Sequence, residues 1–300
     1  MQFISFYIFY GFMWLFTRLP LKVIYGISDL LYLFVFYLVP YRKKLVKRNM
    51  RNSFPDWTEK QLRDHMKKFY RHFCDSFFES SITAFISEKE IKKRFVIKNP
   101  EICNDLYDKE KSITLLMTHY GNWEWSSSMQ LYLQHKTLPI YKPLHNKYFD
   151  NFIKKSRERF GAKTVPMDKT LRILMDYKKK NIPTITFFLA DQRPRWAQIQ
   201  HWIKFMNQDT PVILGPEKIS KKLGNAVLFL KIEKKKRGFY ESEFILVNED
   251  PVKTEPYEIT EKYYKLLEKL FKEKPDYWLW THARWKHEKE KFKQKATPLG

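Results

Sequence analysis

One histidine and one glutamate in the segment Leu115–Trp125 have the spacing that acid–base chemistry requires. The segment reads LLMTHYGNWEW and places His119 five residues before Glu124. An apolar run predicts a strand that ends just before His119, and the Gly-Asn pair that follows predicts a tight turn. Residues five apart on a continuous strand point to opposite faces, so this turn is what would let the carboxylate reach the imidazole ring. A histidine held by a carboxylate is a general base with a fixed tautomer.

A structural interpretation of the same two residues stays open at this point. A histidine beside a turn is often only a hydrogen-bonded structural residue. A glutamate in the first turn of a helix is favoured by the helix dipole alone. The rest of the chain therefore has to show whether other reactive or charged groups gather at the same place.

The elements around this segment predict an α/β fold with a mostly parallel sheet flanked by helices. Strand-like and helical stretches alternate from about residue 95 onward, which is typical of such a sheet. His119 would then lie at the carboxyl end of a buried strand, where open α/β sheets usually carry their chemistry. The predicted strands cover residues 112–117, 139–142, 162–165, 184–190, 226–232 and 242–247, and the predicted helices cover 124–133, 147–160, 169–179, 213–222 and 259–271.

Polar side chains also follow other predicted strands. The segment Tyr141–Asn146 follows one strand, and Asp191-Gln192-Arg193 comes directly after the apolar stretch ITFFLA. Arg157 and Arg159 lie on a predicted helix between these two segments. Several strand ends that deliver Lys, Arg, Asp and His indicate a crevice with cationic walls, suited to phosphate or carboxylate groups.

The first 41 residues predict a hydrophobic membrane anchor, which leaves residues 42–300 as the second domain. Two apolar, aromatic-rich runs cover about residues 3–16 and 23–39, and the cluster Arg42–Arg51 follows with six basic residues and no acid. A basic cluster of this kind is expected on the cytoplasmic side, against anionic lipid. A removable signal peptide is not expected, because the start carries no positive charge and no small-residue cleavage site follows. Whether the anchor spans the bilayer or lies in one leaflet stays open.

The charge balance limits the classes of partner. The 300 residues contain 56 Lys and Arg against 33 Asp and Glu, a net charge of +23, together with 25 Phe, 18 Tyr and 9 Trp. Basic and aromatic composition fits either a single-stranded nucleic-acid binder or a protein of the membrane interface. Aromatic residues concentrate in the N-terminal anchor instead of alternating with Lys and Arg along a groove, which favours the membrane. Two cysteines, Cys74 and Cys103, are too few and too far apart for a disulfide framework or a metal motif.

Two further segments frame the predicted domain. A helix is predicted to begin with a capping box formed by Thr58 and Gln61, and then to show an apolar stripe at Leu62, Met66, Phe69, Phe73 and Phe77. Near the end, WLWTHARWKH predicts a short edge strand or the start of a helix at Trp278–Trp280. In that segment, His282 is expected to play a structural or supporting role.

Taken together, the sequence resembles the lipid A late acyltransferases, the lauroyl and myristoyl transferases within the glycerophosphate and lysophospholipid acyltransferase superfamily. The resemblance covers nearly the whole chain. It rests on the apolar N-terminus and five motifs in order: YRKKLVKRNMRNSFP, THYGNWEW, YKPLHN, ADQRP and WLWTHARWKH.

The resemblance implies a mechanism and a set of site residues. The family motif H-x-x-x-x-D/E corresponds to His119 and Glu124. His119 would take a proton from an acceptor hydroxyl, Glu124 would orient the ring, and the hydroxyl would attack a thioester carbonyl without an acyl-enzyme. The same resemblance implies roles in acceptor binding or site architecture for Lys142, Arg157, Asp191 and Arg193. Lys142 stands where many relatives carry Arg, so charge is kept but bidentate geometry is lost.

The resemblance also implies the partners. The donor would be acyl carrier protein or acyl-CoA, the acceptor a phosphorylated glycolipid, and the site of action the cytoplasmic side of the cell inner membrane. Neither a metal nor a cofactor beyond the acyl thioester is expected, and no nucleic acid. A lysophospholipid, an aminolipid or another glycolipid as acceptor remains open, because the motifs concern the reaction and not the head group.

Overall fold

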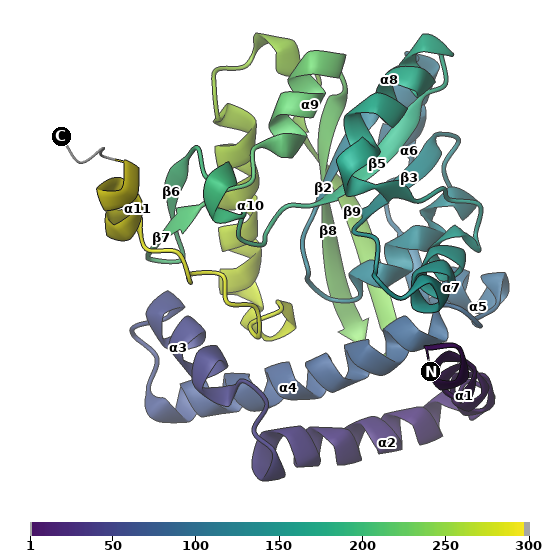
Figure 1. Cartoon of the computed structure of the whole chain (residues 1–300), viewed down its shortest axis with the longest axis vertical. Helices are drawn as coiled ribbons and strands as arrows, with labels where there is room; N and C mark the ends of the chain where they lie inside the picture. Colours follow the sequence, from purple (N-terminus) through teal and green to yellow (C-terminus); the bar gives the residue numbers. More distant parts are fainter. Residues whose placement is uncertain (1, 297–300) are drawn as a thin grey trace.

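A seven-stranded sheet forms the centre of the computed structural model, which describes residues 2–296 (Figure 1). The strand order is β1-β9-β8-β2-β5-β3-β4, and the five strands from β8 to β4 run parallel, while β9 lies antiparallel to β8. The predicted α/β class with a mostly parallel sheet is therefore confirmed. The strands are β1 (Phe95–Ile97), β2 (Ile113–Met117), β3 (Lys136–Tyr141), β4 (Val165–Pro166), β5 (Thr184–Leu189), β8 (Ala226–Lys236) and β9 (Phe239–Asn248).

Helices cover both faces of the sheet because successive residues of the central strand point to opposite sides. Leu116 of β2 packs in one apolar cluster with residues of α4 and α10, and its neighbour Leu115 packs in a second cluster with residues of α5 and α6. The helices are α1 (Gln2–Phe16), α2 (Leu21–Leu33), α3 (Lys43–Ser53), α4 (Glu59–Ile82), α5 (Glu88–Arg94), α6 (Glu101–Asp108), α7 (Lys147–Glu158), α8 (Thr170–Lys179), α9 (Gly215–Leu223), α10 (Glu258–Glu273) and α11 (Lys289–Ala296).

Helix α4 begins at the predicted capping box and lies across the end of the sheet (Figure 1). The Thr58 side chain accepts from the backbone N–H of Gln61, and the Gln61 side chain accepts from the backbone N–H of Thr58. The first part of the predicted stripe is buried, as at Leu62 and Phe69. Phe77 is 59% exposed. The stripe therefore packs on the core at its start and faces a cavity at its end.

The N-terminal apolar runs form α1 and α2, and α2 continues into one π-helical turn, Phe34–Leu38. By length and composition, Leu21–Leu38 could cross a membrane. In this structure α2 packs along α4 (Figure 1). The division between an anchor at residues 1–41 and a second domain at 42–300 stays a prediction.

Several elements differ from the predictions. The short strand β1 and the hairpin β6 (Trp202–Phe205) and β7 (Gln208–Pro211) were not predicted, because their apolar runs are too short to show a period. The helix predicted at 124–133 is a 3₁₀ helix, Trp123–Leu131. The segment at Trp278–Trp280 is neither strand nor helix, although an isolated β-bridge joins Trp278 to Tyr120 and the Leu279 N–H donates to the His119 carbonyl at 3.1 Å. Its indoles are instead held by side-chain packing and hydrogen bonds.

Candidate active site

The carboxylate that holds the His119 ring is Asp191. The Nδ1 atom of His119 lies 2.8 Å from Oδ1 of Asp191. The second oxygen, Oδ2, accepts hydrogen bonds from the Thr118 hydroxyl at 2.9 Å, from the His119 backbone N–H at 3.1 Å and from the Trp278 indole at 2.7 Å. Both oxygens of the buried Asp191 carboxylate therefore have hydrogen-bond partners. These bonds hold the carboxylate in position, and the carboxylate in turn orients the imidazole ring of His119.

The charge on Asp191 is stabilised by the same contacts. Its burial alone would raise the pKa of the carboxyl, but attraction to His119 and the bonds from His119 and Trp278 lower that pKa below its ordinary value. An ionised carboxylate only accepts hydrogen bonds, so Nδ1 of His119 carries the proton and Nε2 presents its lone pair. The side-chain amide of Gln192 lies beside the Nε2 atom of His119, and the amide nitrogen of Gln192 is 3.2 Å from that atom. The histidine is therefore in the tautomer that a general base needs.

Glu124 contacts Arg157, and the predicted contact between Glu124 and the His119 ring is wrong. Two hydrogen bonds join the pair, from Arg157 Nε to Oε2 at 3.0 Å and from Nη2 to Oε1 at 2.6 Å. Burial alone would lower the pKa of Arg157. The charge of Glu124 and the hydrogen bonds to it outweigh burial, so the pKa of Arg157 lies above its ordinary value. After the turn the chain enters a 3₁₀ helix that brings Glu124 toward α7, where the guanidinium offers a bidentate fit. Trp123 packs its ring against His119 instead, with centroids 5.2 Å apart.

The turn between these residues depends on a glycine and a buried glutamate. Gly121 has a φ of +60°, and a Cβ there would lie 3.0 Å from the Ile232 side chain, so a larger residue would be strained. Asn122 donates to Oε2 of Glu79 at 3.0 Å, and its own Oδ1 accepts from the Trp125 backbone at 3.3 Å. Burial raises the pKa of Glu79. Glu79 was not among the predicted site residues. It lies on a different face of α4 from the predicted apolar stripe, so the spacing of that stripe gave no signal for it.

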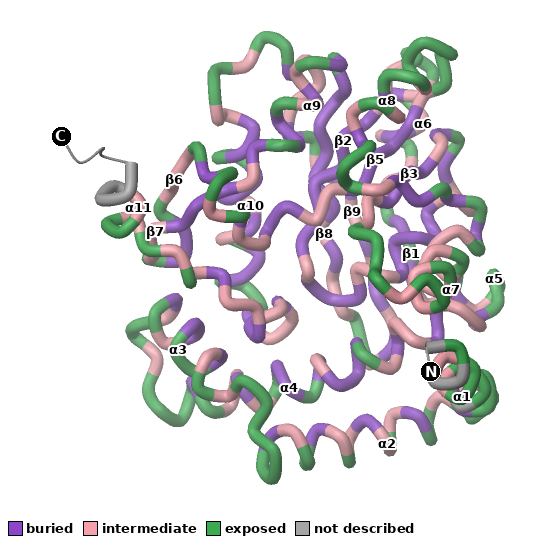
Figure 2. The backbone as a smooth tube through the Cα atoms, viewed as in Figure 1, coloured by how far each residue is buried: buried purple, intermediate pink, exposed green. Residues whose placement is uncertain are grey.

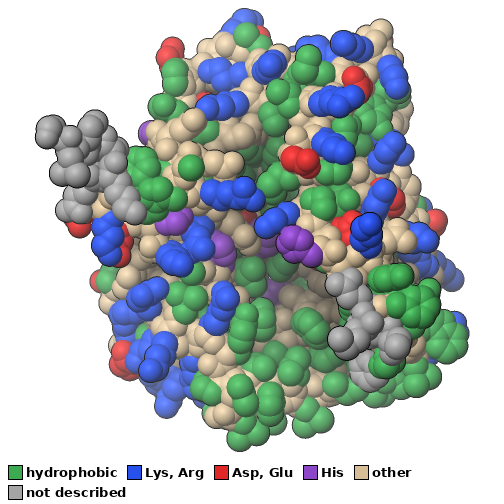
Figure 3. Space-filling view, viewed as in Figure 1, with side chains coloured by type: hydrophobic (Ala, Val, Ile, Leu, Met, Phe, Trp, Pro, Cys, Tyr) green, Lys and Arg blue, Asp and Glu red, His purple; other side chains and the backbone are tan. Residues whose placement is uncertain are grey.

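An apolar cavity of about 410 Å³ opens beside the Glu124–Arg157 pair. Its walls come from α1, α4, α7 and the segment after α10. Trp123 forms part of its lining and also packs on His119, so the cavity lies next to the imidazole. Its apolar lining consists of Phe9, Phe69, Phe73, Phe77, Trp123, Phe149, Phe152, Ile153, Tyr277, Trp278 and Leu279. On the face shown in Figure 3 the surface is hollowed near its centre, with Lys and Arg above the hollow and hydrophobic side chains below it.

The other predicted binding residues lie around this centre in different ways. Lys142 is exposed at the end of β3. Arg193 donates to the Ala283 carbonyl at 3.0 Å, and its backbone N–H donates to Nε2 of His282 at 3.3 Å. Burial lowers the pKa of His282 to about 4, so that ring is neutral. The structural or supporting role of His282 stays a prediction. The Arg193 guanidinium is directed toward the C-terminal segment by its hydrogen bond to Ala283.

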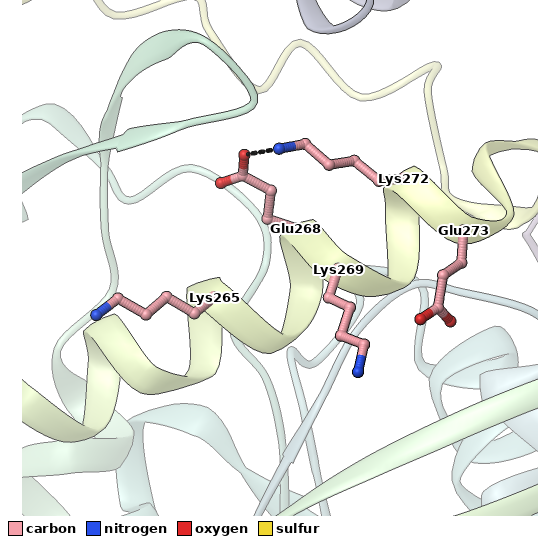
Figure 4. Close-up of a pocket in the computed structure, with 5 residues that line it drawn as sticks. All are labelled: Lys265, Glu268, Lys269, Lys272 and Glu273. Atoms are coloured by element: carbon pink, nitrogen blue, oxygen red, sulfur yellow. Dashed lines mark ion pairs between the residues drawn. The ribbon is translucent and has the colours of Figure 1, made fainter.

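A second hollow, of about 550 Å³, lies on the surface of α10 and carries no comparable chemistry (Figure 4). Its lining consists of Lys265, Glu268, Lys269, Lys272 and Glu273. Lys272 and Glu268 form an ordinary ion pair one helical turn apart, at 2.7 Å. None of the side chains that surround His119 contributes to it. Among residues 2–296, no three His, Cys, Asp or Glu side chains gather as a metal ion would require.

Comparison with known proteins gives two matches. A family model described as bacterial lipid A biosynthesis acyltransferase matches residues 1–287. A lipid A biosynthesis lauroyltransferase from Escherichia coli strain K12 is 24% identical over 140 residues. That alignment covers 47% of this chain and 45% of the relative's length.

Proposed function

The chain belongs to the bacterial lipid A biosynthesis acyltransferase family, and we propose that it moves a fatty acyl chain from a thioester donor to a hydroxyl of a lipid A precursor. The observation that carries this proposal is the His119–Asp191 pair beside an apolar cavity. A hydroxyl is a poor nucleophile near neutral pH unless a base takes its proton, and an acyl chain needs an apolar site. Both requirements meet at one end of the sheet.

The reaction follows from the tautomer of His119. Nε2 accepts the proton of the acceptor hydroxyl as the hydroxyl oxygen attacks the thioester carbonyl carbon, and the imidazolium is stabilised by Asp191. The tetrahedral intermediate then collapses, the C–S bond breaks, and the sulfur leaves with the proton that Nε2 returns. The Gln192 amide lies where the hydroxyl must approach, so the hydroxyl displaces it on binding. The ester and the free thiol balance the step without an acyl-enzyme.

The cavity is proposed to hold the acyl chain. Its volume of about 410 Å³ lies within the range of about 300–1,000 Å³ that is common for small-molecule sites. Glu124 and Arg157 stand at its wall, and their bidentate contact fixes the segment that carries Trp123. Glu124 is therefore proposed to support the site through this segment instead of through the imidazole.

The charged groups at the rim are proposed to bind the phosphorylated acceptor. Lys142 is exposed and available for a phosphate, whereas Arg157 is already neutralised by Glu124. The overall charge of +23 would attract an acidic acyl carrier protein as donor and hold the enzyme at the anionic cytoplasmic face of the inner membrane. Acyl-CoA is the other donor to be compared.

The test is acyl transfer in detergent micelles. Purified protein receives acyl carrier protein or CoA with a labelled chain, and a panel of lipid A precursors, lysophospholipids, aminolipids and other glycolipids. We expect transfer to a lipid A precursor by the parent protein and none by the His119→Ala variant with unchanged circular dichroism. Transfer to a different acceptor on the panel would show that the substrate is not a lipid A precursor, while the proposed acyl-transfer chemistry would stand. Activity that survives His119→Ala would refute the general-base assignment.

A further inference from the structure

We propose that α2 lies flat on an anionic leaflet, as one edge of the catalytic domain, and does not cross the membrane. This inference rests on the proposed action at a membrane surface. Length and composition alone would allow Leu21–Leu38 to span the hydrocarbon core. The side-chain contacts of this segment point to the other orientation.

The inner face of α2 is fixed to the domain by polar contacts with buried groups. Ser28 donates to Asp75 at 2.8 Å, and Tyr25 donates to Glu79 at 2.9 Å. Asp29 accepts two hydrogen bonds from Arg237, both at 2.9 Å. Asp75 and Glu79 are 2% and 0% exposed. A helix that left this position would leave buried carboxylates without these partners, which is costly.

A spanning α2 would also carry its neighbour into the hydrocarbon. Helix α4 runs beside α2 (Figure 1), and its Arg71 lies over the Tyr32 ring at 5.0 Å. The exposed side of α4 is basic, with Lys60, Arg63 and Lys68 among its exposed residues. Charged side chains of this number do not enter the bilayer core. The two helices can share a membrane only if both lie parallel to its surface.

The outer face of α2 is apolar, as an in-plane helix requires. Buried and exposed residues alternate along α2 in Figure 2, with Ile24, Ser28, Tyr32 and Phe36 on the buried side. The exposed side carries Val23, Leu30, Leu33, Phe34, Leu38 and Val39, of which Leu38 is 73% and Leu30 is 67% exposed. Figure 3 shows hydrophobic side chains gathered along this lower edge of the molecule. Helix α1 extends the surface with Tyr7, Ile8, Trp14 and Leu15.

A cationic groove next to this apolar edge selects an anionic leaflet as the partner. The groove, of about 1,050 Å³, lies between the π-helical turn, α3 and the start of α4. Its cations are Arg42, Lys43, Lys44, Lys47, Lys60, Arg63 and Lys67. The one acidic residue in its lining, Glu59, is already paired with Lys47 at 3.0 Å and with Arg51 at 2.6 Å. Lipid phosphates fit such a groove, and an acidic protein would not account for the exposed Leu38 and Val39 beside it.

Cysteine labelling distinguishes the two orientations. Three variants carry the new thiol at different places. Lys22→Cys places it in the first turn of α2, Lys44→Cys in α3 beyond the end of α2, and Lys180→Cys at the C-terminal end of α8. All three positions are exposed, while the natural Cys74 and Cys103 are buried, so the parent protein gives the background. Sealed inverted inner-membrane vesicles are treated with a membrane-impermeant maleimide. A flat α2 predicts equal labelling at all three positions. Labelling of Lys22→Cys only after detergent would show that α2 spans and would overturn the proposal.

Vesicle flotation tests the choice of an anionic leaflet. The Lys44→Gln, Lys60→Gln double variant removes two groove charges, and Lys179→Gln, Lys180→Gln is the matched control on α8. We expect the first pair to bind anionic phospholipid vesicles several-fold more weakly and the control pair to bind as the parent does. Equal binding by both pairs, or no preference of the parent for anionic over neutral vesicles, would overturn the proposal. Neither readout depends on catalysis, so failure of the proposed acyl transfer would be seen separately in the micelle assay.

Discussion

His119 and Asp191 each lie two residues beyond Met117 and Leu189, which are paired in register on the adjacent parallel strands β2 and β5. The two side chains therefore meet at the same level of the sheet edge, and the Nδ1–Oδ1 distance of 2.8 Å follows from this register. Asp191→Asn tests the relationship. An amide can donate to Nδ1, which would transfer the ring proton to Nε2 and remove the base. We expect kcat to fall by about 10³–10⁴-fold, as for other histidine–carboxylate pairs.

The control for Asp191→Asn is Glu124→Gln, assayed with the same donor and acceptor. If Glu124→Gln lost kcat to this extent while Asp191→Asn stayed active, Glu124 and not Asp191 would be the residue that orients the His119 ring. Thermal unfolding of both variants separates a loss of chemistry from a loss of fold.

The Glu124–Arg157 pair is predicted to stabilise the fold measurably. Both side chains are about three-quarters buried, and the contact is bidentate. A double-mutant cycle with Glu124→Gln and Arg157→Gln should give a coupling free energy of about 1–3 kcal/mol in urea unfolding. The exposed pair Lys262–Glu258, one turn apart on α10, is the control and should give about 0.5 kcal/mol or less. A coupling no larger than this control would show that the pair is open in solution.

The cavity predicts a change in chain-length preference. Ile153 lines it from α7, and Ile153→Trp would fill part of its volume. Donors with chains too long for the remaining space should lose about fourfold in kcat/KM for each methylene excluded, since a buried methylene contributes about 0.8 kcal/mol. Asn151→Trp on the exposed side of the same helix should leave the preference unchanged. An equal loss of kcat/KM with donors of every length would mean that the acyl chain binds outside this cavity.

Buried neutral histidines predict a stability that falls with acid. Burial lowers the pKa of His282 to about 4, whereas an unfolded histidine titrates near about 6.5. Between these values the unfolded chain takes up a proton that the folded chain does not, so the free energy of unfolding decreases as pH falls through this window. Burial, with Lys234 nearby, lowers the pKa of His72 as well, which acts in the same direction.

The His282→Gln variant isolates one of these two groups. Urea midpoints at about pH 7 and about pH 4.5 should differ less in this variant than in the parent, since glutamine binds no proton. An unchanged difference would show that His282 is protonated within the fold.

The sequence predicted the sheet and a histidine–carboxylate pair at its edge, but it did not predict which carboxylate contacts His119. His119 and Glu124 are close in the chain, and spacing favoured that pair. Asp191 is 72 residues away from His119, and only the register of β2 against β5 brings the two together. Periodicity predicts that a strand exists, but it does not say which residues of two strands lie opposite each other. The Glu79 contact with Asn122 was hidden in the same way, because it joins elements 43 residues apart.

The cavity that borders Glu124 takes one of its walls from Phe9, and the buried acids Asp75 and Glu79 take hydrogen bonds from Ser28 and Tyr25. All three of these N-terminal residues precede position 42. Removal of the N-terminal apolar segment, a common route to a water-soluble protein for crystallisation or screening, would therefore open the cavity that we propose holds the acyl chain. It would also remove one hydrogen-bond donor from each of these two buried carboxylates. For this protein, solubility has to be sought by changing the outward-facing residues of α2 and leaving the helix in place.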